Sequence, residues 1–340
     1  MTEKRTILTS AEIACLWTGY MNDSMSKCML GYFLKDIKDK EIHSVVQFAY
    51  NLSVIHLEKL TQIFKEENLP IPTGFTDEDV NMNAPRLYTD MFISSYINNM
   101  SKVGLVAYSG FISMSVRKDI RDYSREALQE TSELYEKSIE VALSKGLFVR
   151  APYIAYPSNK DYIDSNKYLS GFSLFSKKRP LNTVEIAHLY LNIQTNLMGS
   201  KLALSFAQIS PRKDIQKWML RGRDISEKHI QVFSSSLLEN HIQPPVSSDI
   251  SITNSTVPPF SDKLIMFHMG LLSTAGTGNY ASAAAASQRS DLILSYERLS
   301  LEIAQYAKDG ADIMIKYSWL EQPPGTLDKD KLSREKNINS

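Results

Sequence analysis

Apolar residues recur every three or four positions along most of the chain, the spacing that gathers them on one face of an α-helix. One such run begins at Ile42 and continues through Val45, Ala49 and Leu52 to His56. Alternation of the kind seen in half-buried strands does not organise the pattern. The spacing predicts eight long helices, at about residues 9–36, 40–68, 88–113, 117–145, 182–209, 212–241, 260–285 and 289–319.

The second half of the chain repeats the first. Residues 8–17 align without a gap with residues 181–190, at an offset of about 173 residues. The same register carries His56 onto His229 and, after a one-residue deletion in a loop, Glu130 onto Glu302. Such self-similarity is the mark of a duplicated structural unit. We therefore expect both halves to share one fold of four helices.

The first helix of each half carries a start signal. Thr9 with Glu12 three residues later forms a capping box, and Asn182 with Glu185 repeats it in a weaker form. Glu185 and His188 also have the Glu-x-x-His spacing of some metal ligands. Because Glu185 lies in the first helical turn, capping explains it better than metal binding.

The lengths of the links between consecutive helices indicate the topology of each half. The links between the first and second and between the third and fourth helices are only a few residues long, so these pairs should be antiparallel neighbours. The link from Leu69 to Leu87 can run the length of a helix of about 38 Å, which lets the second and third helices lie parallel. The sequence thus predicts an all-α protein of two tandem ferritin-like four-helix bundles, each with a long crossover between its second and third helices.

Four segments follow from this architecture. We assign residues 1–150 to the first bundle, 151–180 to an aromatic-rich connector, 181–322 to the second bundle and 323–340 to a disordered tail. The connector should pack on the bundles, because it is too rich in aromatic side chains for a flexible linker. Its aromatic residues are Tyr153, Tyr156, Tyr162, Tyr168, Phe172 and Phe175.

Composition narrows the partners and the compartment. The 38 basic and 38 acidic side chains cancel, which gives no electrostatic footprint for nucleic acid or an anionic membrane. The uncharged stretch between Lys263 and Arg289 contains His268 and several small polar residues, so we expect a buried helix and no membrane span. Cys15 and Cys28 would lie about 20 Å apart on one helix and cannot pair. Free thiols predict a cytoplasmic protein.

Candidate chemistry centres on the histidines in the middle of the second helix of each half. His56 and His229 fall on the core-facing side, and Glu130 and Glu302 lie at the same level on the fourth helices. A buried imidazole needs a hydrogen-bond partner, so each pair should meet. The first helices offer Asp23 and Asn196 nearby, and the third helices carry Tyr96 and His268.

Two interpretations of these residues remain open. In the first, each histidine is a satisfied core residue that orders its bundle, and no cofactor is bound. In the second, they bind a transition-metal ion such as iron, manganese or zinc, with a two-histidine, one-carboxylate set in the second half. The metal-site candidates are His56, Glu130, His229, His268 and Glu302.

Three motifs support a family resemblance: Leu181-Asn-Thr-Val-Glu-Ile186, Met114-Ser-Val-Arg-Lys-Asp119 and Trp319-Leu-Glu-Gln-Pro-Pro324. With them the chain resembles an uncharacterised bacterial family, a domain of unknown function in Bacillus-type spore formers. The resemblance implies ferritin-like helical bundles, often duplicated, and an association with sporulation, the forespore or the spore. The sequence departs from the two-glutamate, two Glu-x-x-His pattern of di-iron members of the ferritin-like fold.

Three functional hypotheses follow. The first is a non-enzymatic structural or interaction protein that binds protein partners or itself; a row of small residues from Gly270 to Ala286 at four-residue spacing would allow close contact with another helix. The second is a degenerate ferritin-like metal binder or oxidase that uses the central histidine and glutamate groups. The third is a protein that binds a small apolar ligand between helices.

Overall fold

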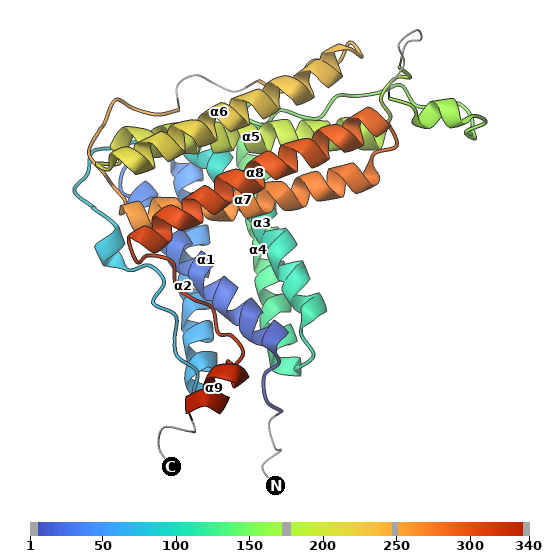
Figure 1. Ribbon diagram of the computed structural model, residues 1–340. Helices are drawn as coiled ribbons and strands as arrows, with labels where there is room; N and C mark the ends of the chain where they lie inside the picture. The colour runs from blue at the N-terminus through green and yellow to red at the C-terminus, as the bar shows by residue number, and fades with distance from the viewer. Residues whose placement is uncertain (1–5, 172–177, 247–250, 336–340) are drawn as a thin grey trace.

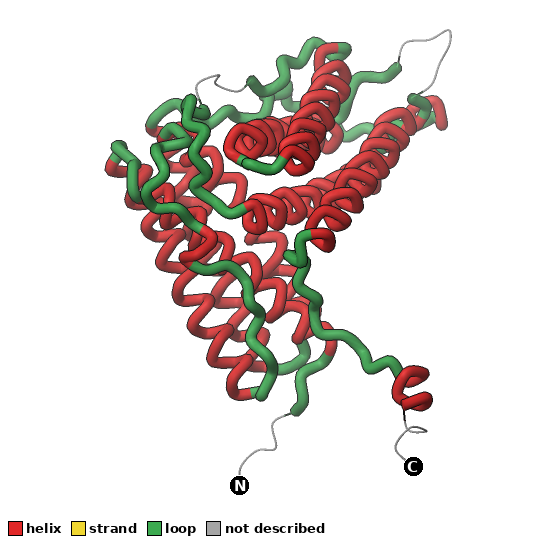
Figure 2. The backbone as a smooth tube through the Cα atoms, turned by 60° about the vertical axis from the view of Figure 1, so that its left-hand side comes forward, coloured by secondary structure: helices red, strands yellow, loops and turns green. Residues whose placement is uncertain are grey.

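A computed structural model describes residues 6–171, 178–246 and 251–335, and their long regular elements are all α-helices. The helices fall into two sets of four, which we call the first and second halves, and Figure 2 shows them connected by loops. The first half holds α1 (Ser10–Leu34), α2 (Lys40–Glu66), α3 (Asp90–Met114) and α4 (Lys118–Ser144). The second holds α5 (Thr183–Ile209), α6 (Lys213–Leu238), α7 (Asp262–Ala286) and α8 (Ser290–Lys316). All eight predicted helices are therefore confirmed.

Both predicted capping boxes form at the helix starts. Thr9 accepts the amide N–H of Glu12, while the Glu12 carboxylate accepts the amide N–H of Thr9 at 2.7 Å. Asn182 and Glu185 make the same reciprocal pair at the start of α5. Each box satisfies amide groups that the first turn of a helix would otherwise leave without partners.

Contacts between helix ends define the topology of each half. The start of α1 meets the α3–α4 turn, where Glu12 accepts the amide N–H of Arg117, and Arg117 also pairs with Glu67 at the end of α2. At the opposite end, the α1–α2 turn meets the start of α3 through Asp39 and Asp90. Helices α2 and α3 therefore run in the same direction, and the link between them spans the length of the half. Equivalent contacts order the second half.

The two halves lie across each other, with α1–α4 running down the view of Figure 1 and α5–α8 running across it. Their long links meet: Val80 pairs with Phe260 and Tyr88 pairs with Ile252 as isolated antiparallel bridges. In the repeat register Val80 corresponds to Ile252 and Tyr88 to Phe260. Val80 thus pairs with the counterpart of Tyr88, and Tyr88 pairs with the counterpart of Val80. This is the self-complementary pattern of a two-fold interface, here within one chain.

A continuous apolar core crosses this interface. One cluster of buried side chains includes Met25 and Phe33 from the first half together with Phe206 and Met269 from the second. Tyr88 donates or accepts a 2.7 Å hydrogen bond with Ser205, which ties the first link to α5. Burial of this shared surface stabilises the halves against each other.

The connector and the tail differ from their predicted behaviour. Tyr153, Tyr156 and Tyr162 are 88, 95 and 89% exposed, so the prediction that the connector's aromatic residues pack on the helices is wrong for them. Their hydroxyl groups keep contact with water, which makes exposure tolerable. Tyr168 packs under the guanidinium group of Arg179, a residue of the connector itself, at 4.0 Å. Phe172 and Phe175 lie outside the described residues.

The tail, predicted to be disordered, contains the short helix α9 (Lys329–Glu335). Asp328 begins it by accepting the amide N–H of Lys331 at 2.9 Å, a local cap that composition alone does not reveal. Nearer α8, Glu321 accepts amide N–H groups from Thr73 and Gly74. The C-terminal segment is thereby attached to the long link of the first half.

Helix α7 occupies the uncharged stretch. Leu264, Ile265 and His268 on one side are fully or almost fully buried, as predicted for a buried helix. On the other side the row of small residues is uncovered, and a Cβ atom added at Gly270 or Gly278 would meet no atom within 4 Å. Among the helices of the described residues, none combines the length and apolarity needed to cross a membrane.

Candidate functional site

The centre of the first half joins one polar side chain from each of its four helices. His56 of α2 places its Nε2 atom 2.8 Å from the Glu130 carboxylate of α4 and its Nδ1 atom 3.0 Å from the Tyr108 hydroxyl of α3. Tyr108 donates to the Asp23 carboxylate of α1 at 3.0 Å, and the other Asp23 oxygen lies 3.4 Å from His56. The predicted meeting of His56 with Glu130 occurs, and all four helices are tied at one level.

The centre of the second half repeats this arrangement with one substitution. His229 of α6 contacts Glu302 of α8 at 3.0 Å through Nε2 and the Tyr280 hydroxyl of α7 at 2.9 Å through Nδ1. The amide nitrogen of Asn196 on α5 donates to that hydroxyl at 2.7 Å. Asn196 is the counterpart of Asp23, and Glu302 also pairs with Lys228 at 2.9 Å.

The change from Asp23 to Asn196 reverses a chain of hydrogen bonds. An ionised carboxylate only accepts hydrogen bonds, so the Tyr108 hydroxyl donates its hydrogen bond to Asp23. It then has no second hydrogen to donate to His56. Nδ1 of His56 must then carry its own proton, and Nε2 must carry another to meet Glu130. His56 is therefore a cation.

In the second half the donor direction runs the other way. The Asn196 amide donates to the Tyr280 oxygen, which leaves the tyrosine proton free for Nδ1 of His229. Only Nε2 then needs a proton, for Glu302. His229 is therefore a neutral imidazole, and the two centres differ by one proton although their geometry is the same.

Electrostatics favour the same assignment. Burial lowers the pKa of His56, but hydrogen bonds and charges of Asp23 and Glu130 outweigh it and raise the pKa to about 9. Burial also lowers the pKa of His229, and there the opposing Glu302 is countered by the positive charges of Lys228 and Arg298, so the pKa stays below its usual value.

The structure does not bring His268 to the second centre. Its Nε2 atom lies 3.4 Å from the Tyr96 hydroxyl of the first half, and its ring packs on Phe206. Along α7 His268 is twelve residues, or about 18 Å, from Tyr280, which contacts His229. Tyr96 and His268 are counterparts in the repeat, so they meet where the two halves meet. Burial holds the pKa of His268 well below its usual value, at about 3.

The donor sets of the two centres do not match the di-iron pattern. Each centre offers one histidine, with two carboxylates in the first half and one in the second, and both ring nitrogens of His56 and His229 already contact side chains of their own half. Within the described residues no group of three or more histidine, cysteine, aspartate or glutamate side chains is arranged to hold a metal ion. Cys15 and Cys28 are free and buried.

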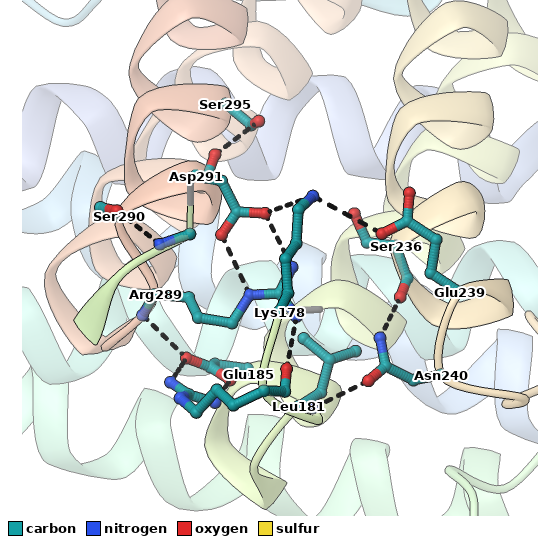
Figure 3. A network of polar contacts seen from close by, with 12 residues as sticks. Lys178, Leu181, Glu185, Ser236, Glu239, Asn240, Arg289, Ser290, Asp291 and Ser295 are labelled. Atoms are coloured by element: carbon teal, nitrogen blue, oxygen red, sulfur yellow. Dashed lines mark hydrogen bonds and ion pairs between the residues drawn. The ribbon is translucent and has the colours of Figure 1, made fainter. Parts of the chain in front are cut away.

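A second polar network closes the end of each half. In the second half Glu185, fully buried, accepts amide N–H groups from Gln288 and Arg289 and an ion pair from Arg179, as part of the network drawn in Figure 3. Arg289 in turn pairs with Asp291 at 2.7 Å. Glu12 and Arg117 make the matching contacts in the first half. Burial raises the pKa of Glu185, but Arg179 and the amide donors outweigh it and lower the pKa. Its role is to join the start of α5 to the α7–α8 turn.

Two tyrosines of these centres were not predicted from the sequence. Tyr108 and Tyr280 complete the centres, and both are buried beside their histidines. The available signal was their correspondence in the repeat: a tyrosine kept at equivalent positions of α3 and α7, three helical turns beyond the pair Tyr96 and His268. The interpretation considered only that latter pair.

Comparison with known proteins identifies the relatives of the chain. A family model described as a protein of unknown function, DUF3231, matches residues 1–159 and again residues 170–332. A crystal structure of a putative spore coat protein from Bacillus halodurans C-125 is similar at 18% sequence identity and a TM-score of 0.40, over 44% of this chain and 98% of that one. No curated protein matches the chain.

Proposed function

The chain belongs to the DUF3231 family of proteins of unknown function, and on this premise we propose that it is a helical structural or interaction protein associated with spores. We propose further that residues 1–150 and 181–322 are ferritin-like four-helix bundles, joined by a connector at 151–180 and followed by a tail at 323–340. In this proposal the protein is made in the cytoplasm and acts in the forespore or spore, through protein partners or self-association.

One observation carries the structural assignment. Both ring nitrogens of His56 and of His229 are engaged by side chains of their own half, so each histidine cross-links helices. A substrate or metal ion that bound to these nitrogen atoms would first have to displace Tyr108 or Glu130 in the first half, or their counterparts in the second. Closed polar networks of this kind rigidify a core.

Two further features support a role in assembly. The paired links and the shared apolar core join the halves into a single rigid support. The uncovered row of small residues on α7, from Gly270 to Ser282, leaves a face on which another helix can approach closely. This face suits protein partners or a second copy of the chain.

The proposal is tested in a sporulating host that expresses the tagged chain at native level. We expect enrichment in extracts of purified spores relative to a cytosolic marker protein. Equal loss of both proteins during spore purification would contradict the association with spores.

Metal analysis separates the alternative, a degenerate ferritin-like metal binder or oxidase. Protein purified without chelator should contain no stoichiometric iron, manganese or zinc. A full equivalent of one of these metals that disappears in the His56→Ala or His229→Ala variant would overturn the structural assignment of that centre.

A further inference from the structure

A cavity of about 110 Å³ lies beside the centre of the first half. Asp23, His56 and Tyr108 form its polar wall. Most of the remaining lining is apolar and includes Leu30, Leu52, Ile97, Met100, Leu134 and Leu271, the last from the second half. The cavity therefore combines a charged group with a mainly apolar lining, a combination that can orient a small ligand.

The second half has a matching cavity at the equivalent place, and it is smaller. Its volume is about 60 Å³, and the Asn196 and Tyr280 side chains stand where the first cavity has Asp23 and Tyr108. Tyr306 replaces Leu134 in its wall, stacked on Trp218 with ring centroids 4.3 Å apart.

The Tyr306 ring has room only because its neighbour is a glycine. A Cβ atom at Gly222 would lie 2.3 Å from the Tyr306 hydroxyl, whereas the counterpart in the first half is Ala49. The duplication thus produced two cavities. A large aromatic side chain narrows the second one, and the first is open and carries a carboxylate.

Charge at the centre of the first half favours a cation. Asp23 and Glu130 are both carboxylates, and the His56 cation between them balances only one, so the centre carries a net charge of about −1. One Asp23 oxygen accepts from Tyr108 at 3.0 Å, while the other lies 3.4 Å from His56, a long contact that leaves it capacity to accept. Among the described residues that line the cavity, none is lysine or arginine, and the His56 cation there is paired with Glu130, which does not line the cavity.

The route to the cavity lies between α1 and α3. Asn22 and Ser26 of α1 line it and are half-buried, as are Val103, Gly104 and Ala107 of α3. Helix α1 packs chiefly on α2, and α3 packs chiefly on α4. A small molecule can therefore enter without separating the tightly packed helix pairs.

We propose that the first half binds a small organic cation, with an ammonium group on the Asp23 carboxylate and a short aliphatic chain among Met100, Leu134 and Leu271. An apolar cavity of about 150 Å³ accommodates benzene, so this one suits a ligand of about four to six non-hydrogen atoms. The site is independent of the structural role proposed above. The second half, with Asn196 and a narrowed cavity, should not bind the same ligand.

The test uses the full chain and n-butylammonium chloride as the probe. Titration calorimetry should give one site, and 1-butanol, the neutral analogue of similar size, should bind at least tenfold more weakly. The Asp23→Asn variant should weaken n-butylammonium binding by about tenfold or more, because a hydrogen bond to a charged group is lost. In ¹³C spectra the Met100 methyl signal should shift on binding, while the methyl signal of Met269 in the second cavity serves as an internal control.

A second variant keeps the proposal testable if Asp23→Asn does not fold. Ala107→Phe fills the half-buried mouth of the cavity and leaves Asp23 intact, so it should abolish the Met100 shift. Equal affinity for butanol and butylammonium would overturn the charge assignment. Absence of any binding would mean that the cavity holds water only, and a shift confined to Met269 would place the site in the wrong half.

Discussion

The centres of the two halves have almost the same geometry, but their histidines differ by one proton. His56 and His229 each bridge a glutamate and a tyrosine at distances of 2.8 to 3.0 Å, yet the first is a cation and the second is neutral. The cause lies one side chain further away, where Asp23 only accepts hydrogen bonds and Asn196 donates one. The comparison shows that a duplicated core can change its protonation while the histidine keeps equivalent contacts, because Asp23 or Asn196 on the first helix of each half sets the direction of the hydrogen-bond chain.

The largest expected effect separates the two histidines. His56→Ala removes the cation that bridges Asp23 and Glu130 and leaves two partly buried carboxylates without it, so the unfolding free energy should fall by about 3 kcal/mol or more. His229→Ala should cost about 1–3 kcal/mol, because Glu302 keeps its ion pair with Lys228. Urea unfolding measures both. Equal losses would contradict the difference in charge.

In the polar networks at the ends of the halves, the substitution in the second half should cost more stability than the matching one in the first half. Glu185→Ala leaves Arg179 without its buried partner and three amide groups without an acceptor, for a loss of about 3 kcal/mol. Glu12→Ala frees only amide groups and one hydroxyl, so we expect about 2 kcal/mol. The same unfolding measurement decides; a larger loss for Glu12→Ala would refute this ranking.

Stability should depend on pH with opposite sign in the two halves. The pKa of His56 is raised to about 9, so its contribution of about 3 kcal/mol is present below pH 6.5 and is lost as the pH rises from 6.5 through 9. The pKa of His229 is lowered, so its contribution is present above pH 6.5 and is lost as the pH falls toward the folded pKa.

The Asp23→Asn variant sharpens this comparison. It gives the first centre the amide of the second and should flatten the alkaline loss of stability between pH 6.5 and 9. Asn196→Asp is the matched control and should create such a loss in the second half. Unfolding midpoints across pH 6 to 9.5 provide the measurement, and an unchanged alkaline slope in Asp23→Asn would show that His56 is not its source.

The smallest effect is expected where the halves meet. The Tyr96 hydroxyl lies 3.4 Å from His268, a weak contact, so Tyr96→Phe should change stability by less than about 1 kcal/mol. Tyr88→Phe is the comparison, since its 2.7 Å bond to Ser205 is short and buried. If Tyr96→Phe proved the more damaging of the two, the interface would depend on a polar contact that the geometry does not support.

The sequence predicted the helices and the pairing of His56 with Glu130 because both depend on local periodicity. Apolar spacing places His56 on the inner face of α2, and equal helix lengths bring Glu130 to its level. Position along a helix axis could also have excluded His268 from the second centre, since the twelve residues to Tyr280 separate them by about three turns.

The remaining features depend on relations between the halves. No local pattern shows that Val80 pairs with Phe260, or that His268 faces Tyr96, because these contacts arise where the two halves cross. The charge difference was present in the sequence as Asp23 against Asn196. Its meaning required the intervening tyrosines, which only the structure placed.

The protonation state of each histidine can be measured in the intact chain. In ¹⁵N spectra at pH 7.5, His56 should show two protonated ring nitrogens and His229 one protonated and one bare nitrogen, with His56 becoming neutral only as the pH approaches about 9. The Asp23→Asn variant should make the two patterns alike at the same pH. Two neutral histidines at pH 7.5 in the unsubstituted chain would contradict the account.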